Sequence, residues 1–265
     1  MTEAPPNWSE PDLAAARQVL ALIEADRAIS AGALTDEQIM VLDGPDLPQV
    51  VEMPWLAEHG GEHPSQLGEV ALRGLVARGD ATVRVSEGEI TGVSAVPAIT
   101  GLMVLRRRSR AVLRVGRATA EDALSAYFYL QPEGQLLEEV VDVNGFHQFT
   151  VLGQNLIGPR LADFIDPTGQ AGTGQLERLG SLRDFLTLSA SLPEMNQAVA
   201  VSTISVATSQ DDPGLSSTVY AGPHGVYWLR QQEDDPEPPQ SEAAVFKFSP
   251  IDRDRLARLP LDLLL

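Results

Sequence analysis

Apolar residues recur at helical spacing at the start of the chain. Four of them follow one another at steps of three, four and three residues: Leu13, Ala16, Leu20 and Ile23. Such a stripe is typical of an amphipathic helix packed on a core. Ser9 is a suitable N-cap, and Pro11 suits a first helical turn. The pattern therefore predicts a helix over residues 11–31.

Further segments carry helical signals, and one short segment is ambiguous. A helix is expected to open at His63-Pro64-Ser65 and to stop at Gly79, which is a natural C′ residue. Four more helices are predicted over residues 95–107, 155–165, 176–192 and 249–265. Residues 36–42 fit a strand or a helix, so both remain open.

The period of the apolar pattern changes to two in the middle of the chain. Alternation over residues 111–115, 127–131, 136–143 and 146–152 predicts an antiparallel meander of about four strands. Pro132-Glu133-Gly134 and Asn144-Gly145 supply its turns. A second set of strands is predicted over residues 198–207, 217–221, 226–231 and 243–248. A short strand pair is predicted earlier, over residues 81–85 and 89–93.

The two halves of the chain repeat one order of elements: helix, meander and closing helix. Pro132-Glu133-Gly134 corresponds to Pro223-His224-Gly225, and both closing helices carry Arg-Leu-Ala. We therefore expect an α/β (α+β) fold with a central, largely antiparallel sheet flanked by helices and a quasi-two-fold internal duplication. The expected parts are a disordered tail at residues 1–8, a first half at 9–167 and a second half at 175–265, packed as one compact domain.

Charge and composition narrow the partners and the compartment. The formal net charge of −18 opposes binding to nucleic acid or anionic lipid, because both are polyanions. The chain has no cysteine, which excludes disulfides, thiolate metal sites and cysteine nucleophiles. The first residues resemble no secretory signal, and no apolar stretch approaches the ~20 residues of a membrane-spanning helix. We expect a cytoplasmic protein without membrane contact.

One motif has the residue spacing of a metal site but lacks the helical propensity that such a site needs. His59-Gly60-Gly61-Glu62-His63 has the H-x-x-E-H spacing of a zinc peptidase, which needs a helix so that both histidines face the metal. Two glycines inside the motif and Pro64 after it favour a loop instead. The sequence also lacks G-x-S-x-G, Walker A and G-x-G-x-x-G motifs. We expect no metal, no cofactor, no catalytic residue and no enzymatic activity.

His147 and the paired acidic residues have simpler structural interpretations. His147 lies between Phe146 and Phe149 in a predicted strand, which favours a core or cross-strand role over catalysis. Glu138-Glu139 and Asp211-Asp212 are adjacent in sequence, and this spacing does not indicate paired acid and base groups.

Arginines gather in one stretch of this acidic chain: Arg106, Arg107, Arg108, Arg110, Arg114 and Arg117. This stretch predicts a local positive patch that binds an acidic partner or the protein's own acidic loops. A solvated helix end with intramolecular ion pairs is an equally good interpretation, so both stay open.

The order of elements and several motifs resemble the EspG family, the cytosolic chaperones of actinobacterial type VII (ESX) secretion. Pro54–His59, followed by residues 72–76, looks like the family's W-L-x-E-H segment and the helix after it. Residues 102–108 resemble its v-l-x-R-R region, and residues 225–232 with 243–250 resemble its C-terminal strand pair. The family fold is a central sheet with helices on both sides and an internal quasi-two-fold. The family usually starts with a strand, where we expect the helix over residues 11–31.

The resemblance implies a non-enzymatic chaperone that masks the apolar tip of a helical PE/PPE or W-x-G type client. Residues 116–124 match by position a family loop that contacts the client. The candidate partner-binding residues lie near this loop and in the second meander: Arg114, Arg117, Glu121, Asp122, Tyr220, Tyr227 and Trp228. For the aromatic residues core packing is the default role, although aromatics at strand ends also anchor interfaces.

Two other classes of function stay open. An immunity or regulatory protein would bind a toxin or effector, and its acidity would suit a basic target. A stand-alone enzyme is the third possibility. In either binding role we expect a monomer or a homodimer.

Overall fold

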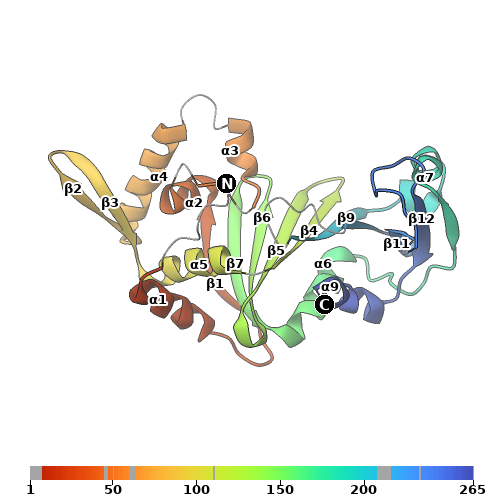
Figure 1. The fold of residues 1–265 in the computed structure, drawn as a ribbon, viewed down its shortest axis with the longest axis horizontal. Coiled ribbons are helices and arrows are strands. Elements are labelled where there is room, and N and C mark those ends of the chain that lie inside the picture. Colours follow the sequence, from red (N-terminus) through yellow and green to blue (C-terminus); the bar gives the residue numbers. More distant parts are fainter. Residues whose placement is uncertain are drawn as a thin grey trace. The chain divides into compact units, whose positions relative to one another are not determined.

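The computed structural model describes residues 8–44, 47–49, 51–59, 64–109, 111–207, 216–232 and 234–264 (Figure 1). It has a mixed α/β fold with a ten-stranded antiparallel sheet flanked by helices, which confirms the predicted fold class. The sheet contains β1 Ile29–Thr35, β4 Val112–Thr119, β5 Ala123–Leu130, β6 Gln135–Asp142, β7 Phe146–Gly153, β8 Arg178–Ser181, β9 Ala200–Ala207, β10 Ser216–Gly222, β11 Gly225–Gln231 and β12 Val245–Pro250. A separate hairpin consists of β2 Ala81–Ser86 and β3 Glu89–Ala95.

The helices agree with most of the predicted segments. They are α1 Glu10–Leu20, α2 Asp36–Asp43, α3 Pro54–His59, α4 Pro64–Arg78, α5 Pro97–Arg108, α6 Ile157–Ile165, α7 Leu182–Leu188, α8 Pro193–Asn196 and α9 Arg253–Leu264. The ambiguous segment at residues 36–42 is a helix. The helix is favoured over a strand because the side chain of Thr35 caps α2 in a full capping box with Gln38.

Two predicted helices are much shorter than expected, and the one predicted over residues 249–265 begins only at Arg253, because Ser249 and Pro250 end β12. The first ends at Leu20: turns with an isolated bridge between Glu24 and Arg27 follow it, and the end of the predicted segment enters β1, which pairs with β7. The helix predicted over residues 176–192 is wrong at its start, where Leu179 lies in β8 opposite Lys247 of β12. Ser181 then caps α7 with Asp184. At β8, strand pairing overrides a helical spacing of apolar residues.

The chain forms two compact units. The first comprises Met1–Arg110 and Tyr127–Gln154, and the second comprises Ala111–Ala126 and Asn155–Leu265. This division differs from the expected halves at residues 9–167 and 175–265, since β4 and α6 belong to the second unit. There α6 packs on α9 so closely that a Cβ on Gly158 would lie 2.6 Å from the carbonyl oxygen of Ala257. Apart from Trp8, the tail expected at residues 1–8 lies outside the described residues.

The strand order is consistent with the predicted internal repeat. The order is β1-β7-β6-β5-β4-β9-β10-β11-β12-β8. The meander β4–β7 has β1 at its outer edge, and the meander β9–β12 has β8 at its outer edge. In each half, this edge strand comes before the meander in the sequence. Each of these edge strands leads directly into a capped helix: Thr35 joins β1 to α2, and Ser181 joins β8 to α7. The repeated Arg-Leu-Ala also has one role in both halves, because Leu161 and Leu256 are fully buried.

A glycine allows α1 and α5 of the first unit to pack in close contact. A Cβ on Gly101 would lie 2.5 Å from the carbonyl oxygen of Ala15 and 2.6 Å from the side chain of Val19. No residue other than glycine fits at this distance without a shift of one helix.

Alanine at Gly101 is therefore expected to lower the free energy of unfolding by about 1–3 kcal/mol. Gly74→Ala in α4 is the matched control, since its Cβ would meet only Nη1 of Arg78, at 3.9 Å. That control is expected to be neutral or stabilising by about 0.5–1 kcal/mol, because alanine favours the helix. Urea denaturation of both variants measures the difference. Equal effects would contradict the close α1–α5 contact.

Candidate protein-binding face

One face of the sheet in the second unit carries small side chains and is partly open to solvent. The register of β4, β9 and β10 places eight residues on this side, which we call the open sheet face: Arg114, Gly116, Ala118, Val201, Thr203, Ser205, Thr218 and Tyr220. Ala118 and Thr203 are exposed, and the other six are partly exposed. A flat surface of this kind lets another backbone approach closely.

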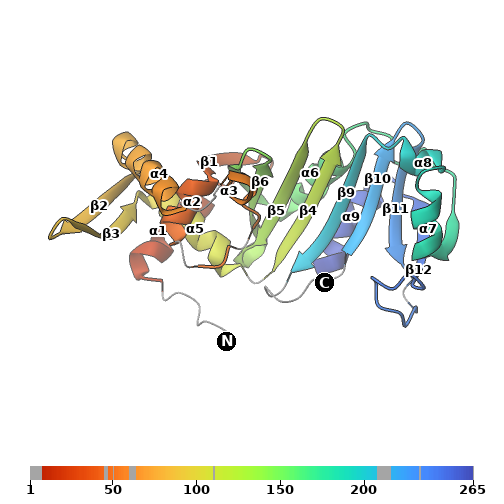
Figure 2. The same cartoon turned by 90° about the horizontal axis from the view of Figure 1, so that it is seen from above.

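The opposite face of the same strands is core. Leu113, Val115 and Val219 are fully buried there. Helices α6 and α9 cover this face, and Figure 2 shows them behind the strands of the second unit. Helices α7 and α8 lie at the other end of the unit, where Phe185 of α7 and Met195 of α8 join an aromatic core with Phe248 of β12. The helices thus leave the open sheet face between β4 and β10 accessible within this unit.

The structure brings only two of the predicted partner-binding residues together on this face, Arg114 and Tyr220. Tyr220 lies at the border with the aromatic core, where its ring meets Phe248 edge-on at 5.9 Å between centroids. Burial raises the pKa of the Tyr220 phenol above its usual value. Arg114 lies opposite Ser205, at the other end of the face.

The other two predicted aromatics do not belong to this face as accessible groups. Tyr227 is buried and stacks on Phe248 at 4.9 Å, and its hydroxyl accepts the backbone N–H of Gln175 at 3.2 Å. Trp228 points to the α9 side of the sheet, with the guanidinium of Arg230 4.6 Å and that of Arg255 5.9 Å from its ring centroid. Core packing therefore describes Tyr227, and cation–π stacking describes Trp228.

The charged residues near the β4–β5 turn hold local structure. Arg117 points away from the open sheet face and anchors α6: its Nη1 donates to the carbonyl of Phe164 at 3.1 Å, and its guanidinium lies 4.7 Å from that ring centroid. The hydroxyl of Thr119 accepts the backbone N–H groups of Glu121 and Asp122 at 3.2 and 3.0 Å. Glu121 and Asp122 thus form the turn that joins β4 to β5.

The arginine stretch divides between the interior and the surface. Arg106 is buried, and Arg107 donates to Asp43 at 2.7 Å and to the carbonyl of Pro48 at 2.7 Å. Arg108 is exposed, and Arg110 lies outside the described residues. The predicted intramolecular ion pairs are therefore present at Arg106 and Arg107, but the predicted solvated helix end is wrong for Arg106, whose charge is compensated in the interior.

A buried ionic cluster occupies the centre of the first unit. His147 of β7 contacts two carboxylates: Nε2 lies 2.6 Å from Oδ1 of Asp36, and Nδ1 lies 2.6 Å from Oε1 of Glu139. Because both ring nitrogens face carboxylate oxygens, both donate and the ring is an imidazolium. The second oxygen of Glu139 accepts Nε of Arg106 at 2.8 Å and the hydroxyl of Tyr129. Arg106 also reaches Asp43 at 3.3 Å.

The charges of this cluster stabilise one another. Burial opposes the charge of Glu139, but the positive charge of Arg106 and the hydrogen bond from His147 lower the pKa of Glu139 to about 2. Burial likewise opposes the charge of His147, but hydrogen bonds to Asp36 and Glu139 raise the pKa of His147 above its usual value. Burial and the charge of Glu139 raise the pKa of Tyr129 well above its usual value. The phenol therefore stays a donor.

This cluster is not built like a catalytic centre. Asp36, Glu139 and His147 have no exposed surface, and both nitrogens of His147 are already hydrogen-bonded. No lone pair remains on the imidazolium to accept a proton from a substrate. The prediction of a core histidine at His147 is confirmed by its burial.

Sequence reasoning missed Glu139, Asp36 and Arg106 as members of one cluster. A signal was present for Glu139, since it alternates with Leu137 and Val141 on the core-facing side of a predicted strand. A carboxylate in such a position requires a buried partner. The sequence does not indicate that this partner comes from α5, or that Asp36 at the start of α2 completes the set.

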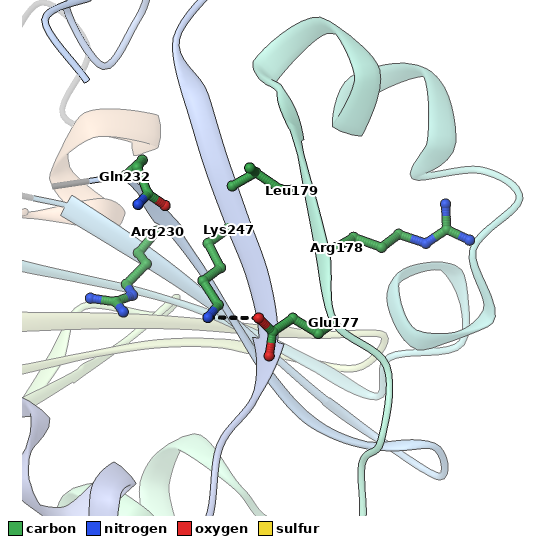
Figure 3. Close-up of a pocket in the computed structure, with 6 residues that line it drawn as sticks. All are labelled: Glu177, Arg178, Leu179, Arg230, Gln232 and Lys247. Carbon is green, nitrogen blue, oxygen red and sulfur yellow. Dashed lines mark ion pairs between the residues drawn. The ribbon is translucent and has the colours of Figure 1, made fainter. Parts of the chain in front are cut away.

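A shallow depression lies near β8 of the second unit. Its volume is ≈ 470 Å³, and it is lined by Glu177, Arg178, Leu179, Arg230, Gln232 and Lys247. Figure 3 shows Lys247 and Glu177 facing each other, with Nζ 2.7 Å from Oε1, whereas Arg178 points away from them. The local ion pair compensates the charge of Lys247, and 66% of Leu179 is exposed beside it.

The H-x-x-E-H motif is described only at its first residue. Nδ1–H of His59 at the end of α3 donates to the carbonyl of Trp55 at 3.2 Å, and residues 60–63 lie outside the described residues. Among the described residues, no group of three or more His, Cys, Asp or Glu side chains is placed to hold a metal ion.

We expect purified protein to contain no stoichiometric zinc, because two glycines in the motif disfavour the helix that such a site requires. Elemental analysis of the protein after dialysis measures this directly. One zinc ion per chain, lost in a His59→Ala variant, would contradict the expectation.

Comparisons with known proteins give no family for this chain. No family model matches it, and no curated protein matches it. One similar solved structure is the crystal structure of the trans-AT PKS dehydratase domain from Brevibacillus brevis, at 9% sequence identity. The similarity covers 54% of this chain and 77% of that chain with a TM-score of 0.13. At that score it supports no conclusion about fold or activity. In the part of the chain that the structure describes, every helix is too short or too polar to cross a membrane.

Proposed function

We propose that this protein is a non-enzymatic chaperone that binds a helical protein client, and that the open sheet face of the second unit holds it. The observation that carries the proposal is this partly exposed face of small side chains. Gly116, Thr203 and Thr218 form its central row. A client helix can lie close to the strands here and bury its apolar stripe.

The border of the open sheet face fits such a client. Tyr220 offers a large aromatic surface with few rotatable bonds, which is typical of an interface anchor. Arg114 at the opposite end places a guanidinium near the edge of the contact, where rim charges guide orientation. A client with an apolar helical stripe and an acidic residue at one end would match both.

The resemblance to the EspG family supports the same proposal. The strand order repeats in the two halves, as an internal duplication of the kind that the family fold implies would require. The chain opens with α1, where the family usually starts with a strand, and β1 follows this helix. By this resemblance the client would be a PE/PPE or W-x-G type protein in type VII secretion. A net charge of −18 helps to keep a carrier of apolar clients soluble in the cytoplasm.

Co-expression with helical PE/PPE or W-x-G proteins encoded near this chain tests the proposal. We expect a one-to-one complex in size-exclusion chromatography that keeps the client soluble. An immunity or regulatory protein would instead bind a neighbouring toxin or effector. A complex with a toxin and none with any helical client would refute the chaperone proposal.

A further inference from the structure

The ionic cluster of the first unit occupies a position that the second unit fills with apolar side chains. The strand register shows which residues of the two units are equivalent. Thr35 at the end of β1 pairs with Phe146, and Ser181 at the end of β8 pairs with Val245. The residues that follow are Asp36 and His147 in the first unit and Leu182 and Phe246 in the second.

The same correspondence holds along the next strands. Glu139 pairs with Phe149, and Leu229 pairs with Phe248. Phe149 lies three residues after Phe146, and Phe248 lies three residues after Val245. Because Phe149 and Phe248 are therefore equivalent, their partners Glu139 and Leu229 are equivalent too. Leu229 and Phe246 belong to the aromatic core of the second unit, and the partly buried Leu182 packs against it. The fold thus joins a capped helix to the sheet with apolar residues in one half and with buried charges in the other.

We propose that the cluster of Asp36, Glu139, His147 and Arg106 is a conformational latch that releases α2 from the sheet of the first unit when His147 loses its proton. Apolar residues suffice for the equivalent junction, so stability alone does not require buried ions here. The buried ions make the packing of α2 on the sheet depend on the protonation state of His147.

Both ends of α2 are held by this cluster. Asp36 at the start of the helix receives His147, and its second oxygen accepts the backbone N–H of Leu56 at 3.0 Å. Asp43 at the end of the helix receives Arg106 at 3.3 Å and Arg107 at 2.7 Å. A change of charge at His147 therefore acts on α2 and on the start of α3 together.

The titratable and charged groups around His147 come from α2, α5, β5 and β6. They are Asp36, Asp43, Arg106, Arg107, Tyr129 and Glu139. When His147 is an imidazolium, it forms three cations with Arg106 and Arg107. These balance the three carboxylates of Asp36, Asp43 and Glu139. A neutral ring would leave one excess negative charge, and one unprotonated nitrogen would face a carboxylate oxygen at 2.6 Å. Release of α2 lets water reach that carboxylate.

The direction of the pH response follows from the raised pKa of His147. A raised pKa means that the histidine stabilises the fold fully below its unfolded pKa of about 6.5, and that this contribution is lost as pH rises through the folded pKa. Glu139 limits the other side, since its stabilising contribution is lost as pH falls toward its pKa of about 2. The latch is therefore closed at mildly acidic pH and opens as pH rises through the raised pKa of His147.

Hydrogen exchange of the full chain at about pH 6 and about pH 9, corrected for intrinsic exchange rates, tests the latch. We expect protection of the α2 amides to fall at least about tenfold more than protection of the α7 amides, which form the internal control. An equal change in α2 and α7 would overturn the proposal.

The matched variant takes the second unit's residues at three positions, Asp36→Leu, Glu139→Leu and His147→Phe, and adds Arg106→Met so that no buried cation is left without Glu139. We expect its α2 amides to lose the excess pH response, and a retained response would overturn the latch. If this variant does not fold, nitrogen chemical shifts of His147 in the unaltered protein decide. An imidazolium at about pH 6 that deprotonates together with the α2 change supports the latch. A neutral ring at about pH 6, or titration separate from α2, overturns it.

Discussion

Glu139→Gln is expected to lower the free energy of unfolding by roughly 3–5 kcal/mol, because it breaks a buried charge network on one side only. Both carboxylate oxygens of Glu139 accept hydrogen bonds from buried donors, one from His147 and the other from Arg106 and Tyr129. An amide of the same shape would direct its NH₂ group at one set of these donors. Urea denaturation at neutral pH measures the loss.

The matched control is Glu58→Gln in α3, where the same chemical change occurs on an exposed side chain. We expect that control to stay within about 0.5 kcal/mol of the unaltered protein. If Glu139→Gln also stays within that range, the network described around Glu139 does not stabilise the fold.

Thr203→Arg is expected to weaken a complex with the helical client at least about 100-fold, since a long charged side chain would stand in the middle of the open sheet face. Thr203 is exposed and lies between Gly116 and Thr218 in the strand register, so the folded protein should tolerate the change. Isothermal titration with the co-purified client measures the affinity, and thermal unfolding confirms that the variant is folded.

Thr187→Arg in α7 makes the same substitution at another exposed threonine of the second unit. We expect it to leave client affinity within about twofold of the unaltered protein, as is usual for surface positions outside an interface. Equal affinity of the two variants would move the client to a different surface.

The sequence predicts the meanders well because their signals are local. Asn144-Gly145 and Pro223-His224-Gly225 mark hairpins whose neighbouring strands alternate clearly, and the structure has both hairpins. Turn chemistry and a period of two act over a few residues, so single-sequence reasoning can find them.

The errors occur where a distant strand decides the local structure. The segments that become β1 and β8 lie beside helical patterns, and only pairing with β7 and β12 makes them strands. The same limit applies to the candidate binding residues. Alternation separates Tyr220 and Tyr227 from Trp228, but the sequence does not show which side of the sheet the helices cover.

The buried cluster shows a third kind of limit. His147 could be assigned to the core from its neighbours, yet its partners Asp36 and Glu139 come from elements that meet only in the folded chain. The arginine stretch looked like a single surface feature because charge is usually exposed. Arg106 departs from that rule, since Glu139 and Asp43 compensate its charge in the interior.

The most direct test of the central claim, that the open sheet face holds a helical client, uses the absence of native cysteine. In a Thr203→Cys variant the introduced thiol is unique, and its rate of reaction with a maleimide reports access to the face. We expect the client to slow this reaction at least about tenfold, while the thiol of a Thr187→Cys control reacts at an unchanged rate. Unchanged reactivity at position 203, in a sample that chromatography shows to be the complex, would contradict the claim.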